Sequence, residues 1–212
     1  MTLASDPRDL GVFLARLVRL DPSTLVRGRP AGTGHLTLWA RLPFDVLAAR
    51  TVAGTWPEDA TVAAADLLAV VSGAGSLGGA GPLEGAGSFE LPRRRDADWR
   101  GSLPPERGWQ HLDAIPADVV RKLVEAGERA FRAAGEAVAQ AAGESLLDHE
   151  TLRVSGGNGP EVAVPFRLLL GLARMAFLGE EPVTVAVLGA WVRLAADHGV
   201  IYRRTGSALL TG

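Results

Sequence analysis

The chain has 212 residues, a net charge of −2 and no cysteine. The lack of cysteine excludes disulfides, thiolate catalysis and thiolate metal sites, and the near-neutral charge excludes a global basic field that would attract nucleic acid or an anionic membrane. Hydrophobic residues make up 47% of the sequence, which suffices for a sizeable core. No apolar stretch is long enough to cross a membrane and the N-terminus lacks a signal pattern, so we expect a cytosolic protein.

The first part of the chain predicts a helix followed by three strands. The helix begins at Asp6-Pro7 and ends at Asp21-Pro22, with leucines at helical spacing between them. Ala31-Gly32-Thr33-Gly34 is typical of a hairpin turn. Thr61 is placed to cap a second helix that ends near Val71. The three strands are expected at residues 25–29, 35–42 and 44–52.

The middle of the chain contains one long helix. Residues 73–87 are rich in glycine and are expected to form a loop, and residues 88–115 are expected to be irregular apart from a short strand at 88–91. Pro116 then begins a helix that runs to about residue 142. Glycine recurs every eighth residue at 127, 135 and 143, either because another element packs closely there or as an accident of composition.

The last part of the chain predicts a hairpin, an apolar helix and three more strands. Gly156-Gly157-Asn158-Gly159 is a hairpin signal between two short apolar runs. The helix that follows ends at Gly179, and Asp197-His198-Gly199 is expected to turn the final pair of strands. The hairpin strands are expected at 152–155 and 161–165, the helix at 166–178, and the last strands at 183–188, 190–196 and 200–204.

These elements predict an α+β fold with antiparallel sheets, a long helix and a buried apolar helix. Both ends of the chain read helix, strand, strand, strand, and Trp39-Ala40-Arg41-Leu42 is similar to Trp191-Val192-Arg193-Leu194. We therefore expect a single domain, 1–212, with two pseudo-repeated lobes, unless these short matches arise by chance from common residues. The lobes would span 5–72 and 145–212, joined by the loop 73–87, the irregular segment 88–115 and the helix 116–142.

Tryptophan and arginine side chains suggest a binding surface. Residues two apart in a strand share a face, so Trp39 lies beside Arg41, and Trp191 beside Arg193. The arginine-rich loop ending at Trp99 adds a second cationic and aromatic group. The alternative is that each arginine only covers a tryptophan at a sheet surface. The candidate binding residues are Trp39, Arg41, Arg93, Arg94, Arg95, Trp99, Trp191 and Arg193.

The sequence predicts no catalytic residues, no cofactor and no metal ion. Gly73-Ala74-Gly75-Ser76-Leu77-Gly78 matches the G-x-G-x-x-G pattern of dinucleotide-binding turns, but the glycines and proline that follow cannot easily propagate the helix that such a turn needs. The four histidines lack the spacing of a helical zinc site. No serine-nucleophile motif is present.

A non-catalytic cytosolic interaction or regulatory protein is therefore the favoured function. Its partner would be a protein, either another copy of this chain in a homodimer or a different protein. Nucleic acid is a weaker candidate, because Asp96 and Asp98 reduce the positive field of the arginine-rich loop. The alternative is a small-molecule-binding domain, or an enzyme of unrecognised type, with a pocket between the two lobes.

Overall fold

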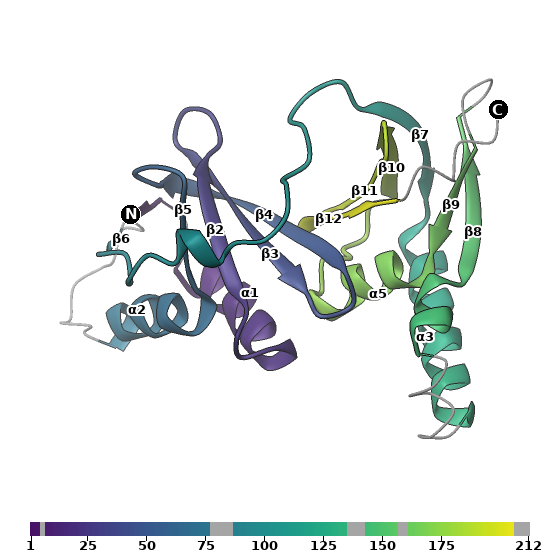
Figure 1. Ribbon diagram of the computed structural model, residues 1–212, viewed down its shortest axis with the longest axis horizontal. Helices are drawn as coiled ribbons and strands as arrows, with labels where there is room; N and C mark the ends of the chain where they lie inside the picture. Colours follow the sequence, from purple (N-terminus) through teal and green to yellow (C-terminus); the bar gives the residue numbers. More distant parts are fainter. Residues whose placement is uncertain (5–6, 77–86, 135–142, 157–160, 206–212) are drawn as a thin grey trace. The chain divides into compact units, whose positions relative to one another are not determined.

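The computed structural model describes residues 1–4, 7–76, 87–134, 143–156 and 161–205 (Figure 1). The chain divides into two compact units. Unit 1 comprises Met1–Pro43 and Leu47–Ser102, and unit 2 comprises Phe44–Val46 and Leu103–Gly212. That these units form one domain stays a prediction from the sequence.

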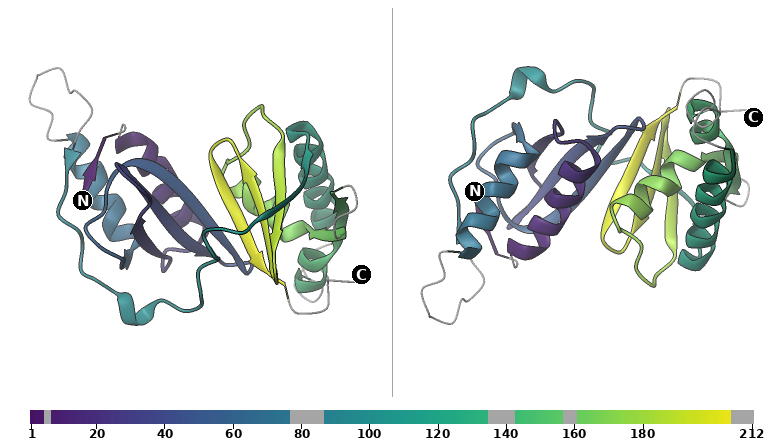
Figure 2. Two further views of the ribbon diagram at one scale, coloured as in Figure 1. Left: turned by 90° about the horizontal axis from the view of Figure 1, so that it is seen from above. Right: turned by 90° about the horizontal axis from the view of Figure 1, so that it is seen from below.

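Unit 1 is a sheet covered by two helices. Its strands follow the order β5-β2-β3-β4, and β1 pairs with both β4 and β6. Helices α1 and α2 pack against each other and lie on one face of the strands (Figure 2). The elements are β1 (Thr2–Leu3), α1 (Pro7–Leu20), β2 (Leu25–Pro30), β3 (His35–Leu42), β4 (Val46–Thr55), β5 (Ala60–Ala63), α2 (Ala64–Ser76), β6 (Gly87–Ser88) and the 3-10 turn η1 (Asp96–Asp98).

The core of unit 1 follows from the periods of its sequence. The apolar positions of α1 recur at helical spacing and are fully buried: Leu10, Phe13, Leu14 and Leu17. In β3 every second residue is buried, namely Leu36, Leu38, Ala40 and Leu42. Trp39 and Arg41 alternate with these residues, so they lie on the opposite face of the sheet, as the sequence predicts.

Unit 2 combines a second sheet with a separate hairpin. Its strands follow the order β7-β10-β11-β12, and β8 and β9 form a separate two-stranded sheet. Helix α5 packs against β12 and against α3. The elements are β7 (Gln110–Ile115), α3 (Ala117–Ala134), a short helix at 143–148, β8 (Glu150–Ser155), β9 (Glu161–Pro165), α5 (Phe166–Arg174), β10 (Val183–Leu188), β11 (Trp191–Ala196) and β12 (Gly199–Arg204).

The predicted α+β class and the repeated helix–strand–strand–strand order are both confirmed. In unit 1 the run is α1, β2, β3 and β4, and in unit 2 it is α5, β10, β11 and β12. Each run places its strands in sequential order, and each has one more strand antiparallel to the first: β5 beside β2 and β7 beside β10. The extra strand follows the run in unit 1 and precedes it in unit 2.

Four expectations about local structure were wrong. Thr61 does not cap a helix, because β5 pairs with β2 there and α2 begins three residues later, at Ala64. Gly73 to Ser76 are helical rather than a loop, whereas 77–86 lie outside the described residues. Residues 110–115 form β7 because they pair with β10. Helix α5 ends at Arg174 instead of 178, since Ala176 adopts a left-handed φ of 49°.

Candidate functional site

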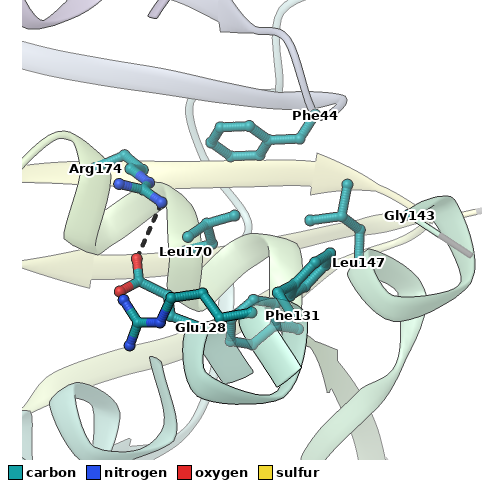
Figure 3. Close-up of a pocket in the computed structure, with 9 residues that line it drawn as sticks. Phe44, Glu128, Phe131, Gly143, Leu147, Leu170 and Arg174 are labelled. Atoms are coloured by element: carbon teal, nitrogen blue, oxygen red, sulfur yellow. Dashed lines mark ion pairs between the residues drawn. The ribbon is translucent and has the colours of Figure 1, made fainter. Parts of the chain in front are cut away.

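A pocket of about 430 Å³ lies among the helices of unit 2 (Figure 3). Helix α3 contributes three residues at helical spacing, α5 contributes three more, and the short helix 143–148 and the residues before β4 complete the wall. A volume of this size falls in the range of natural ligand sites. The lining residues are Phe44, Glu128, Phe131, Arg132, Gly143, Leu147, Phe166, Leu170 and Arg174.

The interior of the pocket is apolar. Phe166 and Leu170 lie one turn apart on α5 and are 4% and 9% exposed. The ring of Phe131 on α3 lies 6.1 Å from that of Phe166, centroid to centroid, with the planes tilted by 31°. Phe44 and Leu147 face Leu170 and Phe131 across the pocket (Figure 3). These side chains present a surface that favours apolar groups over water.

Gly127 explains how the Phe166 ring comes so close to α3. A Cβ atom built on Gly127 would overlap that ring, whereas one built on Gly143 would meet nothing within 4 Å. Of the three glycines at eight-residue spacing, Gly127 is therefore required by close packing, and Gly135 lies outside the described residues. The glycine on α3 thus shapes the floor of the pocket.

An ion pair lies at one end of the pocket. An Nη2 of Arg174 lies 3.0 Å from Oε1 of Glu128, and Figure 3 shows this pair at the end away from Phe131 and Leu147. Arg132 also lines the pocket and is exposed. Among the described lining residues, two arginines and one glutamate sum to a net charge of +1. Within the described part of the chain, no carboxylate lies within 4.0 Å of the Arg132 guanidinium.

Arg167 positions two parts of the pocket lining, the residue Phe44 and the short helix 143–148. Its side chain is buried, and its Nη1 donates to the Phe44 carbonyl at 2.9 Å. Its Nη2 lies 2.9 Å from Oε2 of Glu144 and 2.9 Å from Oδ2 of Asp148, both on the short helix 143–148. Arg203 of β12 binds the other oxygen of Asp148 at 2.7 Å. These contacts hold the carbonyl of Phe44 and the helix that carries Leu147.

In unit 1 the structure brings three of the predicted binding residues, Trp39, Arg94 and Trp99, close to Arg27. Trp39 pairs with Arg27 across β2 and β3, and the Arg27 guanidinium lies 5.8 Å from the centroid of the Trp99 ring. Arg94 and Trp99 line a second pocket of about 420 Å³ together with Arg27, Asp59, Thr61, Asp96 and Gly101. Arg41, also in unit 1, donates from Nη1 to the Arg100 carbonyl at 3.5 Å.

Most charged side chains that line this second pocket form ion pairs with one another. Arg27 donates to both carboxylate oxygens of Asp59, at 2.6 and 2.7 Å, and this bond holds the pKa of Asp59 below its ordinary value. Arg94 pairs with Asp96 and Glu58, and Arg95 pairs with Asp98. Because positive and negative groups are matched here, the pocket carries little net field.

The arginine-rich segment is also fastened to the edge of the sheet. The backbone N–H of Thr61 in β5 donates to Oδ1 of Asp96 at 2.6 Å, and this bond is the main reason that the pKa of Asp96 is lowered. The Thr61 carbonyl accepts from the backbone N–H of Arg95 at 2.7 Å. The neighbouring Arg93 is exposed. The segment therefore lies along β5 as a strap.

The remaining predicted residues, Trp191 and Arg193, belong to unit 2. Arg193 lies over the ring of Trp109, 5.0 Å from its centroid, and Trp109 in turn contacts Tyr202 at 5.6 Å. Trp191 pairs with Arg204 across β11 and β12. That the eight residues form a binding surface stays a prediction.

The unit 2 pocket is not among the features that the sequence predicts. The helical spacing of Glu128, Phe131 and Arg132 placed them on one side of α3, which was the available signal. In the described residues no group of three or more histidine, aspartate or glutamate side chains is placed to hold a metal ion. No described helix is both long and apolar enough to cross a membrane.

Comparison with known domains divides the chain much as the fold does. Residues 1–85 match a domain of unknown function (DUF8010), and residues 104–208 match another domain of unknown function (DUF8185). Apart from residues 44–46, the first match lies in unit 1, and the second lies in unit 2. No curated protein sequence is significantly similar to this chain.

Solved structures of bacterial beta clamps share the fold. The Helicobacter pylori beta clamp in complex with carprofen is 14% identical with a TM-score of 0.56, over 98% of this chain and 64% of that one. The beta subunit of the Streptococcus pyogenes DNA polymerase is 14% identical with a TM-score of 0.59, over 100% of this chain and 65% of that one. The Helicobacter pylori beta clamp bound to a DNA ligase peptide is 14% identical with a TM-score of 0.54, over 100% of this chain and 68% of that one. The chain thus spans less than two thirds of the first two clamps and has their fold.

Proposed function

We propose that this chain is a non-catalytic, cytosolic interaction protein that binds short apolar peptide segments of partner proteins in the unit 2 pocket. The observation that carries the proposal is the construction of that pocket. Its interior is apolar and formed by helices, and the ion pair between Arg174 and Glu128 lies at one end. Grooves between helices commonly bind apolar side chains of a peptide in this way.

The fold comparison supports a role in protein binding. One of the similar structures is a beta clamp bound to a DNA ligase peptide. That protein is only 14% identical to this chain, so its ligand suggests the class of partner and not the partner itself. DNA is the weaker candidate, because the net charge of −2 provides little attraction for phosphates.

The arrangement of Arg167 supports a pocket that exists before a peptide arrives. Three hydrogen-bonded or ionic contacts within 2.9 Å fix the Phe44 carbonyl and the helix that carries Leu147. A preformed site saves the ordering cost that a flexible site would have on binding. The pocket therefore suits short, weakly structured segments, whose own ordering already costs free energy.

The proposal is tested by NMR titration of the ¹⁵N-labelled full chain with the capped peptide acetyl-Gly-Leu-Leu-Gly-Gly-amide. We expect saturable shifts of the backbone resonances of Phe131, Leu147 and Leu170, with a dissociation constant on the order of 1 mM. Absence of saturable shifts at about 10 mM peptide, or shifts confined to other residues, would overturn the proposal.

Two matched variants locate the site. Leu147→Glu places a carboxylate in the pocket wall and should abolish the shifts, whereas Val119→Glu makes a similar change at an exposed position of α3, 37% exposed, and should leave them unchanged. The dispersion of each amide spectrum shows whether the variant is folded. If Leu147→Glu is not folded, Leu147→Ala replaces it, with a weaker but still measurable loss of affinity.

A further inference from the structure

We infer that the unit 2 pocket selects peptides that carry an acidic residue beside their apolar side chains, an inference that rests on the proposed function. The pocket has two chemically different ends (Figure 3). Phe131 and Leu147 lie at the apolar end, and Arg174 and Glu128 lie at the other. A peptide that fills the apolar end therefore has its neighbouring residue near charged groups.

The charges of the described lining residues are unequal. Arg132 and Arg174 contribute two positive charges and Glu128 contributes one negative charge, so the described lining residues have a net charge of +1. The existing pair joins Arg174 to Glu128 at 3.0 Å, while Arg132 has no carboxylate within 4.0 Å among the described residues. An incoming carboxylate therefore meets a described lining with a net positive charge, and a lysine meets repulsion.

The charged lining residues Glu128, Arg132 and Arg174 are here called the rim of the pocket. A peptide carboxylate can compete with Glu128 for Arg174. The side chains of Arg174 and Glu128 are 50% and 32% exposed, and ion pairs with this exposure stabilise proteins only weakly. A peptide carboxylate can thus share Arg174 without breaking a strong contact. Because Arg presents a planar fork of donors, it suits a carboxylate better than a lysine in the same place would.

Three capped peptides test the inference in the same NMR titration: acetyl-Gly-Leu-Leu-Asp-Gly-amide and its counterparts with Asn or Lys in place of Asp. At low salt we expect the Asp peptide to bind about fivefold more tightly than the Asn peptide, and the Lys peptide to bind most weakly. The difference should shrink in 0.5 M NaCl, since salt screens charges near the surface.

Variants of the rim give opposite expectations for opposite charges. Glu128→Gln removes the competing carboxylate and should tighten binding of the Asp peptide, whereas Arg132→Gln should weaken it to the level of the Asn peptide. Arg129→Gln is the matched control, because Arg129 lies on the same helix, pairs with Glu125 and does not line the pocket. It changes the net charge of the protein by the same amount as Arg132→Gln and should have no effect.

The outcomes separate the two proposals. If the three peptides bind the pocket with equal affinity, or if Glu128→Gln weakens binding of the Asp peptide, the charge selection is wrong while the apolar peptide site stands. If no peptide produces shifts that Leu147→Glu removes, the proposed function itself is wrong. If the Asp preference is lost equally in Arg129→Gln and Arg132→Gln, it arises from the overall charge, and the inference about the rim is wrong.

Discussion

Replacing Arg167 with methionine should destabilise unit 2 and loosen one wall of its pocket. The arginine is 1% exposed, and its contacts reach the Phe44 carbonyl, Glu144 and Asp148. Methionine is flexible enough to occupy much of the same space, but it donates no hydrogen bond. The substitution therefore removes the polar contacts while keeping most of the packing.

The size of the effect follows from the surroundings of each partner. Removing one member of a buried ion pair costs about 3–5 kcal/mol when the other charge stays buried. Here the side chains of Glu144 and Asp148 are 81% and 48% exposed, so water can replace most of what they lose. The Phe44 carbonyl loses a bond to a charged donor, worth about 1.5–3 kcal/mol. We expect the free energy of unfolding to fall by about 2–3 kcal/mol.

Urea unfolding measures the loss, and hydrogen–deuterium exchange shows where it occurs. Exchange should accelerate in 143–148 and in α5, and remain unchanged in the strands of unit 1. Arg174→Met is the control on the same helix, because Arg174 is 50% exposed and its ion pair should be worth less than about 1 kcal/mol. Equal losses in the two variants would refute the anchoring role of Arg167.

Three further expectations concern packing and titration. Gly127→Ala should lower the melting temperature because the alanine Cβ would overlap the Phe166 ring, although alanine is the better helix former by about 1 kcal/mol. Gly11→Ala in α1 is the control and should raise the melting temperature, because a Cβ there meets nothing within 4 Å. The pKa values of Asp59 and Asp96 are lowered from 3.8 in the folded protein, so both carboxylates stabilise it above that pH. This stabilisation is lost as the pH falls through the lower folded pKa values. Replacing both with asparagine should therefore make the urea midpoint less dependent on pH in acid. Tyr202 is the single tyrosine, and burial raises its pKa above 10.0. The phenolate absorbance should therefore appear above pH 10.0, and stability should fall as the pH rises through the folded pKa. A midpoint of the absorbance titration at or below pH 10.0 would contradict the burial of this side chain.

The parts of the fold that depend on local pattern were predictable from the sequence. The alternation of Leu36, Leu38 and Leu42 with Trp39 gave the strand and its two faces, and the turn at Gly32 and Gly34 gave the hairpin, where both glycines have positive φ. The order of strands in the two runs followed from the same short-range signals. Such features are set by neighbours a few residues apart.

The parts that depend on distant contacts were not predictable. Thr61 lies before an alanine-rich run that favours a helix, and only its pairing with Arg27 in β2 makes it a strand residue. The pocket needs Phe44, whose carbonyl is held by an arginine 123 positions later. Helical spacing in the sequence relates Glu128 to Phe131 and to Arg132, three and four residues later, but it does not show which residues face them.

The strap along β5 bears on how the chain can be divided in the laboratory. A bare strand edge invites another chain to add to it, and this is a common origin of aggregation. In unit 1 both outward backbone groups of Thr61 are already bonded, to Arg95 and to Asp96. A fragment that stops at residue 85, where the first domain match ends, leaves those groups open. A fragment extended to Ser102 keeps them covered, so the choice of boundary decides whether an isolated unit 1 stays dispersed.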